Sequence, residues 1–271
     1  FKSITNYAWH LFVIINKLLI GNIHYMKILV LDIETSPHKG FHWGLFQQNI
    51  SLNQLIESST VLCWAAKWLD KKKIFFSSVY DTTAIKMIKE VHDLINEADA
   101  VITYNGKRFD MPTLNKEFLI HKLPPPSPYK DIDLLTTTRN KFRFASNKLD
   151  YVANLLNVGK KVSHEGMPLW IDCMAKNPKA WKLMKKYNIN DVKITEEVYY
   201  KLHGWISVHP NHNLETKEMC CPNCGGYNLQ KRGSQVSLTN KYQRFQCQDC
   251  GKWSKGKKPI EKIQSDSVVP I

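Results

Sequence analysis

The sequence predicts an α/β fold, in which a mixed β-sheet is flanked by helices, followed by a small cysteine-rich module. Strand-like apolar runs and segments of helical periodicity follow one another between residues 26 and 205, as in a sheet that helices cover. Two C-x2-C pairs come later, beyond a polar linker. A chain of 271 residues has room for one good-sized core and one such module.

The elements of the first part are predicted from their apolar patterns. The run 28–31 is long enough for one buried strand. Ile85, Ile88, Val91 and Ile95 recur at helical spacing, which predicts an amphipathic helix over 82–98. Further strands are predicted at 61–69, 73–80 and 100–105, a short helix within 146–159 that Gly159 ends, and a long helix from Asn177-Pro178.

The charge balance indicates the class of partner. Apolar content of 43% and charged content of 23% are ordinary for a globular protein. The chain nevertheless carries 38 Lys and Arg against 24 Asp and Glu, a net charge of +14. Such an excess favours a polyanionic partner such as nucleic acid. Five of the seven cysteines lie within 220–250 at metal-ligand spacing, which suits a reducing cytoplasm.

The first 25 residues match neither a membrane span nor a signal peptide. The apolar run 8–20 is too short to cross a bilayer and contains Lys17. No small-residue cleavage site precedes Met26. Because MKILVLDIET resembles a natural protein start, we expect residues 1–25 to be upstream sequence outside the fold, and we expect no membrane attachment.

Two carboxylates stand at the end of the first strand. Asp32 and Glu34 lie two residues apart, so a strand would project both to the same side. Side by side and partly desolvated, they repel each other, and a divalent cation would relieve that repulsion. An Asp-x-Glu pair arises by chance about once in a chain of this length, so an acidic turn is the alternative. Trp43 lies just past the pair, where its ring could stack on a base.

Two further acids stand where ordinary helix signals also explain them. Asp110 precedes a Pro-containing first helical turn, so a normal N-cap is the alternative to a ligand role. Tyr187 and Asp191 are four apart, hence on one helix face. Asp191 stands among apolar residues, and an inward-facing Asp needs a partner. The DIDLL segment at 131–135 is interpreted as the start of a short helix, with its acids as caps.

The cysteine pairs predict a metal-dependent module over 219–256. Cys221 and Cys224 form one C-x2-C pair, and Cys247 and Cys250 form the other, with 22 residues between the pairs. Each pair is followed by glycine, and strand-like segments lie between them. This pattern is typical of a four-thiolate zinc ribbon, which has too little core to fold well without its metal. Cys220 is left as a spare cysteine.

The ribbon region is also strongly basic. From Lys217 onward there are ten Lys and Arg against four acids, an excess of six positive charges. Zinc with four thiolates would subtract about two of these charges. Tyr242, Arg244, Phe245 and Trp253 combine rings with this charge, as in surfaces that follow a phosphate backbone and stack bases. The alternatives are a structural ribbon with solvated charges or a ribbon that docks a protein.

The segments LDIET, NGKRFD and YNIND together resemble the three exonuclease motifs of the DEDD superfamily of 3′→5′ exonucleases, in its tyrosine subgroup (DEDDy). Motif order and spacing agree over about residues 26–205. The chain is most similar to a group of predicted exonucleases common in phage genomes that end in a zinc ribbon. The segment QRFQCQDCGKW is more loosely similar to transposase-associated DNA-binding ribbons. The resemblance implies a ribonuclease-H-like mixed sheet flanked by helices.

The resemblance also implies roles for individual residues. Asp32, Glu34, Asp110 and Asp191 would be ligands of two Mg²⁺ or Mn²⁺ ions, and Tyr187 would hold the attacking water. Asn105 and Phe109 match flanking positions of the second motif, where similar enzymes contact substrate. Hard oxygen ligands suit these ions, and two ions would stabilise the attacking and leaving oxygens of a phosphodiester.

These observations lead to a metal-dependent 3′→5′ exonuclease, with DNA favoured over RNA, two catalytic ions and one structural zinc. The expected organisation is an exonuclease domain over 26–206, a linker at 207–218, the ribbon at 219–256 and a basic flexible tail at 257–271. Nucleic acid is the expected partner, with a replication or repair protein as a further candidate, in the cytoplasm of a bacterial host if phage-encoded. The alternative is a non-catalytic nucleic-acid-binding or transposition-accessory ribbon protein; an endonuclease of the same fold is a third reading.

Overall fold

The computed structural model describes residues 26–216 and 218–269. Two compact units are present: Lys27–Pro210, and a second unit that contains Asn211–Ile271. The division falls inside the segment 207–218, where we expected a linker. Our expectation for residues 1–25 falls outside the described residues. Within the described part, no helix is long and apolar enough to cross a membrane.

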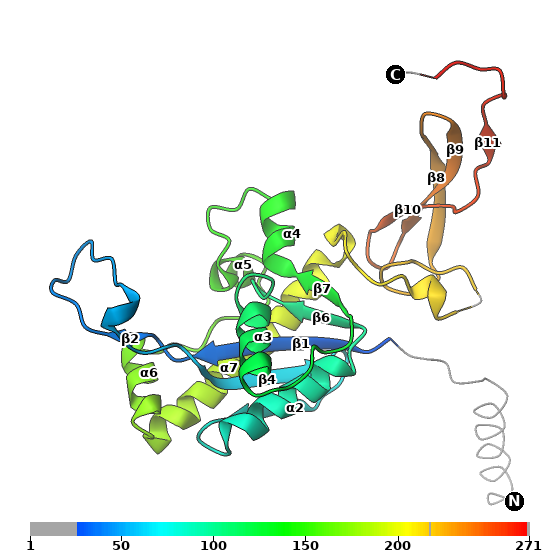
Figure 1. The fold of residues 1–271 in the computed structure, drawn as a ribbon. Coiled ribbons are helices and arrows are strands. Elements are labelled where there is room, and N and C mark those ends of the chain that lie inside the picture. The colour runs from blue at the N-terminus through cyan, green and yellow to red at the C-terminus, as the bar shows by residue number, and fades with distance from the viewer. Residues whose placement is uncertain (1–25, 217, 270–271) are drawn as a thin grey trace, which may run out of the picture. The chain divides into compact units, whose positions relative to one another are not determined.

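A five-stranded mixed sheet forms the centre of the first unit (Figure 1). The strands are β1 (Ile28–Thr35), β4 (Val61–Trp68), β5 (Ile74–Ser78), β6 (Ala100–Thr103) and β7 (Lys130–Asp133). Their order is β5-β4-β1-β6-β7, with β1 in the middle. β4 runs antiparallel to β1 and to β5, whereas β6 runs parallel to β1 and to β7. The predicted α/β fold class, a mixed sheet flanked by helices, is confirmed.

Helices cover both faces of this sheet. They are α2 (Ala84–Asn96), α3 (Asp110–Ile120), α4 (Leu134–Lys141), α5 (Leu149–Leu155), α6 (Met167–Met174) and α7 (Pro178–Leu202). Leu29, Leu31 and Ile33 pack against buried residues of α2 and α3. The alternate residues of β1 therefore point to the face that α7 covers, and Asp32 and Glu34 are among them. A second buried cluster joins β4 to α6 and α7.

The long helix α7 is held over the sheet by polar as well as apolar contacts. It begins at Asn177, whose side chain accepts a hydrogen bond from the Lys179 amide, with Pro178 in the first turn. Lys67 on β4 and Glu196 on α7 form a buried ion pair, in which both side chains are about one tenth exposed. This pair connects α7 to β4, the strand next to the central strand β1.

Among the elements that the sequence did not predict are one strand of the main sheet and one helix. The segment from Lys130 to Asp133 is a short strand, β7, and not the beginning of a helix. Only Ile132 and Asp133 of this strand are buried, since it lies at the sheet edge and has no apolar alternation to mark it. Asp133 does cap the following helix α4, because its carboxylate accepts from the Leu135 amide at 2.9 Å. The eight-residue helix α6 was also missed.

The second unit is built on a small antiparallel sheet. Its strands are β8 (Leu229–Val236), β9 (Asn240–Cys247), β10 (Trp253–Lys255) and β11 (Glu261–Lys262). β9 lies at the centre and pairs with the other three. Because β11 pairs with β9, the sheet continues past residue 256, where we expected the ribbon to end and a flexible tail to begin. Asn213 bonds the backbone of Cys220 in both directions, so part of the expected linker is built into this unit.

A two-stranded stem leaves the first unit near the end of β1. It consists of β2 (Lys39–Gly40) and β3 (Leu55–Glu57), and the loop between them projects away from the main sheet (Figure 1).

Candidate functional site

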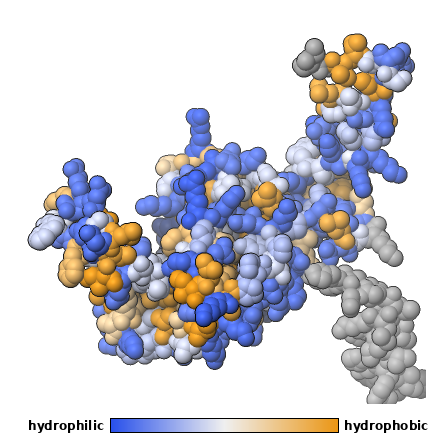
Figure 2. Space-filling model, in the orientation of Figure 1, coloured by the Kyte–Doolittle hydropathy of each residue, from blue (hydrophilic) through white to orange (hydrophobic). Residues whose placement is uncertain are grey.

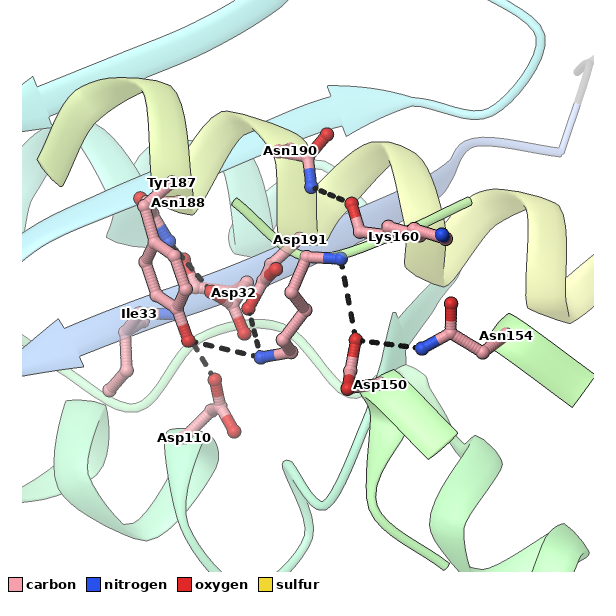
Figure 3. Close-up of polar contacts among 11 residues, drawn as sticks. Asp32, Ile33, Asp110, Asp150, Asn154, Lys160, Tyr187, Asn188, Asn190 and Asp191 are labelled. Atoms are coloured by element: carbon pink, nitrogen blue, oxygen red, sulfur yellow. Dashed lines mark hydrogen bonds and ion pairs between the residues drawn. The ribbon is translucent and has the colours of Figure 1, made fainter. Parts of the chain in front are cut away.

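Three carboxylates from two elements meet on the α7 side of the sheet, and Figure 3 shows two of them, Asp32 and Asp191. Oxygen atoms of Asp32, Glu34 and Asp191 all lie within 4.8 Å of one another. Asp32 and Glu34 reach this point because they alternate with the core residues of β1. Asp191, which is 2% exposed, reaches it from α7. The acidic-turn alternative for the Asp32–Glu34 pair therefore does not hold.

Asp110 joins the same region from a third element. It is the first helical residue of α3, while Phe109 takes the N-cap position without a side-chain cap. The Asp110 carboxylate accepts a hydrogen bond from the Ile33 amide on β1 at 3.2 Å. Its side chain thus turns toward the strand that carries Asp32 and Glu34. All four predicted acidic residues are brought to one end of β1.

Burial and mutual repulsion raise the pKa values of these groups. Burial, and then the charge of Asp191, raises the pKa of Glu34 to about 8. Burial raises the pKa of Asp110 to about 7, although the Ile33 amide opposes the shift. Burial, and then Glu34, raises the pKa of Asp32 well above its usual range. The protein thus holds carboxyl groups where ionisation is costly unless positive charge is supplied.

Asn188 fixes Asp32 in this arrangement. Its amide group donates to a carboxylate oxygen of Asp32 at 2.7 Å and to the Asp32 carbonyl at 3.2 Å, and Figure 3 shows the contact between α7 and β1. We did not single out Asn188 from the sequence. Its position three residues before Asp191 places it on the same helical face, so helical spacing offered a signal for it.

Lys161 was also missed, and it brings positive charge to the cluster. Its ammonium group donates to Tyr187 Oη at 3.0 Å and to a carboxylate oxygen of Asp191. Burial alone would lower the pKa of Lys161, but Asp191 and Tyr187 raise it above its usual value. The residue lies in the loop between α5 and α6, where a single lysine leaves no periodic signal.

Tyr187 is held by two neighbouring rings and by the hydrogen bond from Lys161. It is 8% exposed, and the rings of His164 and Trp170 pack against its ring edge to face, with distances between ring centroids of 4.8 and 6.1 Å. Burial, followed by the charge of Asp191, raises the pKa of its hydroxyl, which therefore stays protonated. The hydroxyl lies beside the acidic cluster as a neutral hydrogen-bonding group.

The donor set fits divalent cations. Asp191 Oδ1 is buried and has no hydrogen-bond partner within the described part of the chain. A buried carboxylate oxygen without a partner costs stability, and a metal ion is a ligand that would satisfy it. Oxygen ligands alone, without sulfur or imidazole in the cluster, suit Mg²⁺ or Mn²⁺.

The three predicted substrate contacts are placed differently from one another. Asn105 follows β6, which runs parallel to β1, and has a φ of +77°, a left-handed conformation that asparagine tolerates better than most residues. Phe109 is 42% exposed, beside Asp110. Trp43 is 97% exposed in the loop between β2 and β3.

The four cysteines of the second unit form a separate cluster. All four sulfur atoms lie within 4.8 Å of one another, with Cys221–Cys250 at 3.7 Å and Cys224–Cys247 at 3.6 Å. A tetrahedral zinc site with Zn–S bonds of 2.3 Å has sulfur–sulfur edges of about 3.8 Å. Gly225 and Gly251, which follow the pairs, have φ values of +72° and +74°, and each donates its amide to the turn it closes. The geometry fits a four-thiolate metal site.

Comparison with known proteins agrees with this architecture. A sequence model of the RNase_H superfamily matches residues 29–203, more than half of the chain. The chain belongs to the RNase_H superfamily. No curated protein matches it. Among solved structures, the chain is similar to the family B DNA polymerase from the hyperthermophilic archaeon Pyrobaculum calidifontis, with 20% sequence identity and a TM-score of 0.48. That match covers 66% of this chain and 24% of the polymerase, so the chain spans about a quarter of the polymerase's length.

The clustered carboxyl groups make stability depend on pH when no divalent cation is added. Their folded-state pKa values lie above the ordinary 3.8–4.5, at about 7 for Asp110 and about 8 for Glu34. Between these limits the folded state binds more protons than the unfolded state, so the free energy of unfolding falls as the pH rises from 5 to 8. Added Mg²⁺ should raise the free energy of unfolding and offset this fall, by about 2.7 kcal/mol when its concentration is a hundred times its dissociation constant.

Urea unfolding at several pH values, with and without Mg²⁺, measures both effects. Asp32→Asn together with Glu34→Gln should flatten the pH dependence and reduce the Mg²⁺ effect. Asp93→Asn, which removes an acid that is 61% exposed, is the matched control and should change neither. A parent protein whose stability is the same at pH 5 and pH 8 without Mg²⁺ would contradict this electrostatic account of the site.

Proposed function

We propose that this protein is a metal-dependent 3′→5′ exonuclease of the tyrosine DEDD subgroup, acting on DNA in preference to RNA. Membership in the RNase_H superfamily supports nuclease activity in general. The observation that carries the proposal is the convergence of four carboxylates from β1, α3 and α7 at one end of the central strand. The direction of cleavage and the subgroup rest on the three sequence motifs.

The residues divide the work by position. Asp32, whose charge is influenced by Glu34, Asp110 and Asp191, would contact both cations, and the other three acids would complete the ligand set. Bound Mg²⁺ or Mn²⁺ would activate a water molecule and stabilise the attacking and leaving oxygens. Asn188 orients Asp32, and Tyr187 offers a neutral hydroxyl that can orient the water. Asn105 and Phe109 are proposed to contact the terminal nucleotides.

A non-catalytic role explains the first unit less well. Burying several carboxyl groups together raises their pKa values and costs folding stability, as the shifts of Asp32 and Glu34 indicate. A unit that served only to carry the ribbon would have no reason to keep this cost. The buried cluster therefore favours an enzyme over an accessory protein.

We propose that the zinc ribbon holds the nucleic acid. Arg244 lies over the ring of Trp253 at 4.9 Å, and Lys255 lies over the ring of Tyr242 at 4.4 Å. Arg244 on β9 pairs directly with Lys255 on β10, so these four side chains form one basic, aromatic face. Phe245, which we grouped with them from the sequence, is 8% exposed and belongs to the opposite side. The exposed face suits phosphates and stacked bases.

Asp32→Ala should abolish cleavage while the protein stays folded, because a proposed ligand of both ions is lost. A decrease of about 10⁴-fold is expected for the loss of metal-organised transition-state stabilisation. The assay uses 5′-labelled single-stranded DNA and RNA with Mg²⁺. The parent should shorten the labelled strand one nucleotide at a time from its 3′ end. Asp93→Ala is the control and should keep the parental rate.

Two results would contradict the assignment. Asp32→Ala with a rate within tenfold of the parent would remove Asp32 from the reaction. Mid-length fragments from the first turnover, or cleavage of a circular strand, would indicate an endonuclease and not an exonuclease.

Charge removal on the ribbon face should weaken binding and reduce its dependence on salt. Arg244→Gln with Lys255→Gln removes two charges from the basic, aromatic face. The slope of log affinity against log salt for long single-stranded DNA should flatten by about 1.4, at 0.7 per phosphate contact. Lys257→Gln with Lys258→Gln, between β10 and β11, changes net charge equally and should have a smaller effect. Equal effects of both pairs would show that only net charge matters, and unchanged slopes would favour a protein-docking ribbon.

A further inference from the structure

An arm rich in apolar residues projects from the end of the strand that carries the acidic cluster. We define the arm as residues 39–57, with β2 and β3 as its stem. Figure 2 shows apolar residues gathered on this projection, which Figure 1 places beyond the end of β1. Its exposed large apolar side chains are Phe41 (73%), Trp43 (97%), Leu45 (84%), Phe46 (84%), Ile50 (47%), Leu52 (89%) and Ile56 (55%). Exposed apolar side chains in this number on one segment mark an interaction surface.

Contacts across the stem hold the base of the arm together, a short distance along the chain from Glu34. Phe41 and Gln54 exchange hydrogen bonds across the stem, both at 2.9 Å. Lys39 forms an ion pair with Glu57 at 2.7 Å. A side chain at Gly40 would meet the Gln54 carbonyl at 2.9 Å, so this close approach requires glycine. Lys39 is the fifth residue after Glu34, which limits their separation to about 18 Å, or about five base steps of a duplex at 3.4 Å each.

The distribution of charge indicates which part of a nucleic acid the arm would meet. Residues 41–56 contain no Asp, Glu, Lys or Arg, although the chain as a whole carries +14. Basic residues lie instead at the foot of the arm. Lys39 and Lys176, together with Glu57, line a cavity of about 510 Å³ there, and the ammonium group of Lys116 bonds the carbonyl of Ser59. Phosphates suit the lysines at the foot, whereas residues 41–56 offer them no charge.

The side chains of the arm suit nucleobases. Aromatic rings stack on bases of any sequence, and aliphatic side chains such as Leu45 and Leu52 are of the type that wedges between base steps. Gln47, Gln48 and Asn49 add amide groups that can bond base edges. An active site that acts on a single strand end needs paired ends to be opened first, and unstacking the terminal bases costs free energy.

We propose that the arm is a wedge that unstacks and separates the bases at a paired 3′ end, so that one strand can reach the carboxylates. This inference rests on the proposed exonuclease function and adds the paired terminus of a duplex as a substrate. The rings of Trp43 and Phe46 take the stacking role, and the lysines at the foot bind the adjacent phosphates. A protein that covers the arm is the competing occupant, and the experiment separates the two.

The test compares paired and unpaired ends with the full-length protein. Trp43→Ala with Phe46→Ala should lower the rate on a blunt duplex by about tenfold or more, as expected for lost base stacking. The rate on the same labelled strand without its complement should stay within twofold. Leu119→Ala with Ile120→Ala, two exposed apolar residues at the far end of α3, is the matched control and should leave both rates unchanged.

A second readout needs no cleavage. In an Asp32→Ala background, binding to a duplex with 2-aminopurine next to its 3′ end should raise the fluorescence as the base unstacks. Adding Trp43→Ala and Phe46→Ala should remove that rise. A parent that cleaves nothing yet raises the fluorescence would contradict the proposed function and support the wedge.

Three results would overturn the wedge. The first is an equal fall on single and paired strands, and the second is unchanged rates with an unchanged fluorescence rise. The third is a parent that is oligomeric in solution and becomes monomeric on substitution of Trp43 and Phe46 with both rates unchanged, which would assign the arm to a protein interface.

Discussion

Repulsion among carboxylates gathered at one end of β1 is the constraint on which the site depends. Asp32, Glu34 and Asp191 lie within 4.8 Å of one another, and Asp110 reaches the same strand from α3. Burial raises the pKa values of these groups, so their ionised forms are unfavourable in the folded protein unless positive charge lies nearby. The Lys161 ammonium donates to Asp191 and Tyr187 and supplies part of this positive charge. Divalent cations would supply the remaining positive charge, and β1, α3 and α7 hold the carboxylates in place for them.

The sequence predicted those parts of the site that follow from periodicity. Alternation along β1 placed Asp32 and Glu34 on one face, and the spacing of four placed Tyr187 and Asp191 together on α7. The fold class followed from the order of strand-like and helical patterns. Patterns in one segment carry no information about which distant backbone group a carboxylate will meet. The bond from the Ile33 amide to Asp110, 77 residues away, was therefore visible only in the structure.

Residues without a periodic context were missed. Lys161 stands in an irregular loop, and its role follows only from the way that loop passes over α7. The edge strand β7 has one apolar residue buried against the sheet, too little for an alternating pattern. Phe245 was grouped with the exposed rings because sequence composition does not say which side of β9 a ring takes; alternation on that strand assigns it to the side opposite Tyr242 and Arg244.

The central claim is that the carboxylate cluster binds two divalent cations side by side. Diffraction from crystals soaked in Mn²⁺, recorded near the manganese absorption edge, tests it most directly. The account predicts two anomalous peaks about 4 Å apart, with Asp32 in contact with both and Glu34, Asp110 and Asp191 completing the ligands. No peak at saturating Mn²⁺, with the Lys161 ammonium still bound to Asp191, would contradict it.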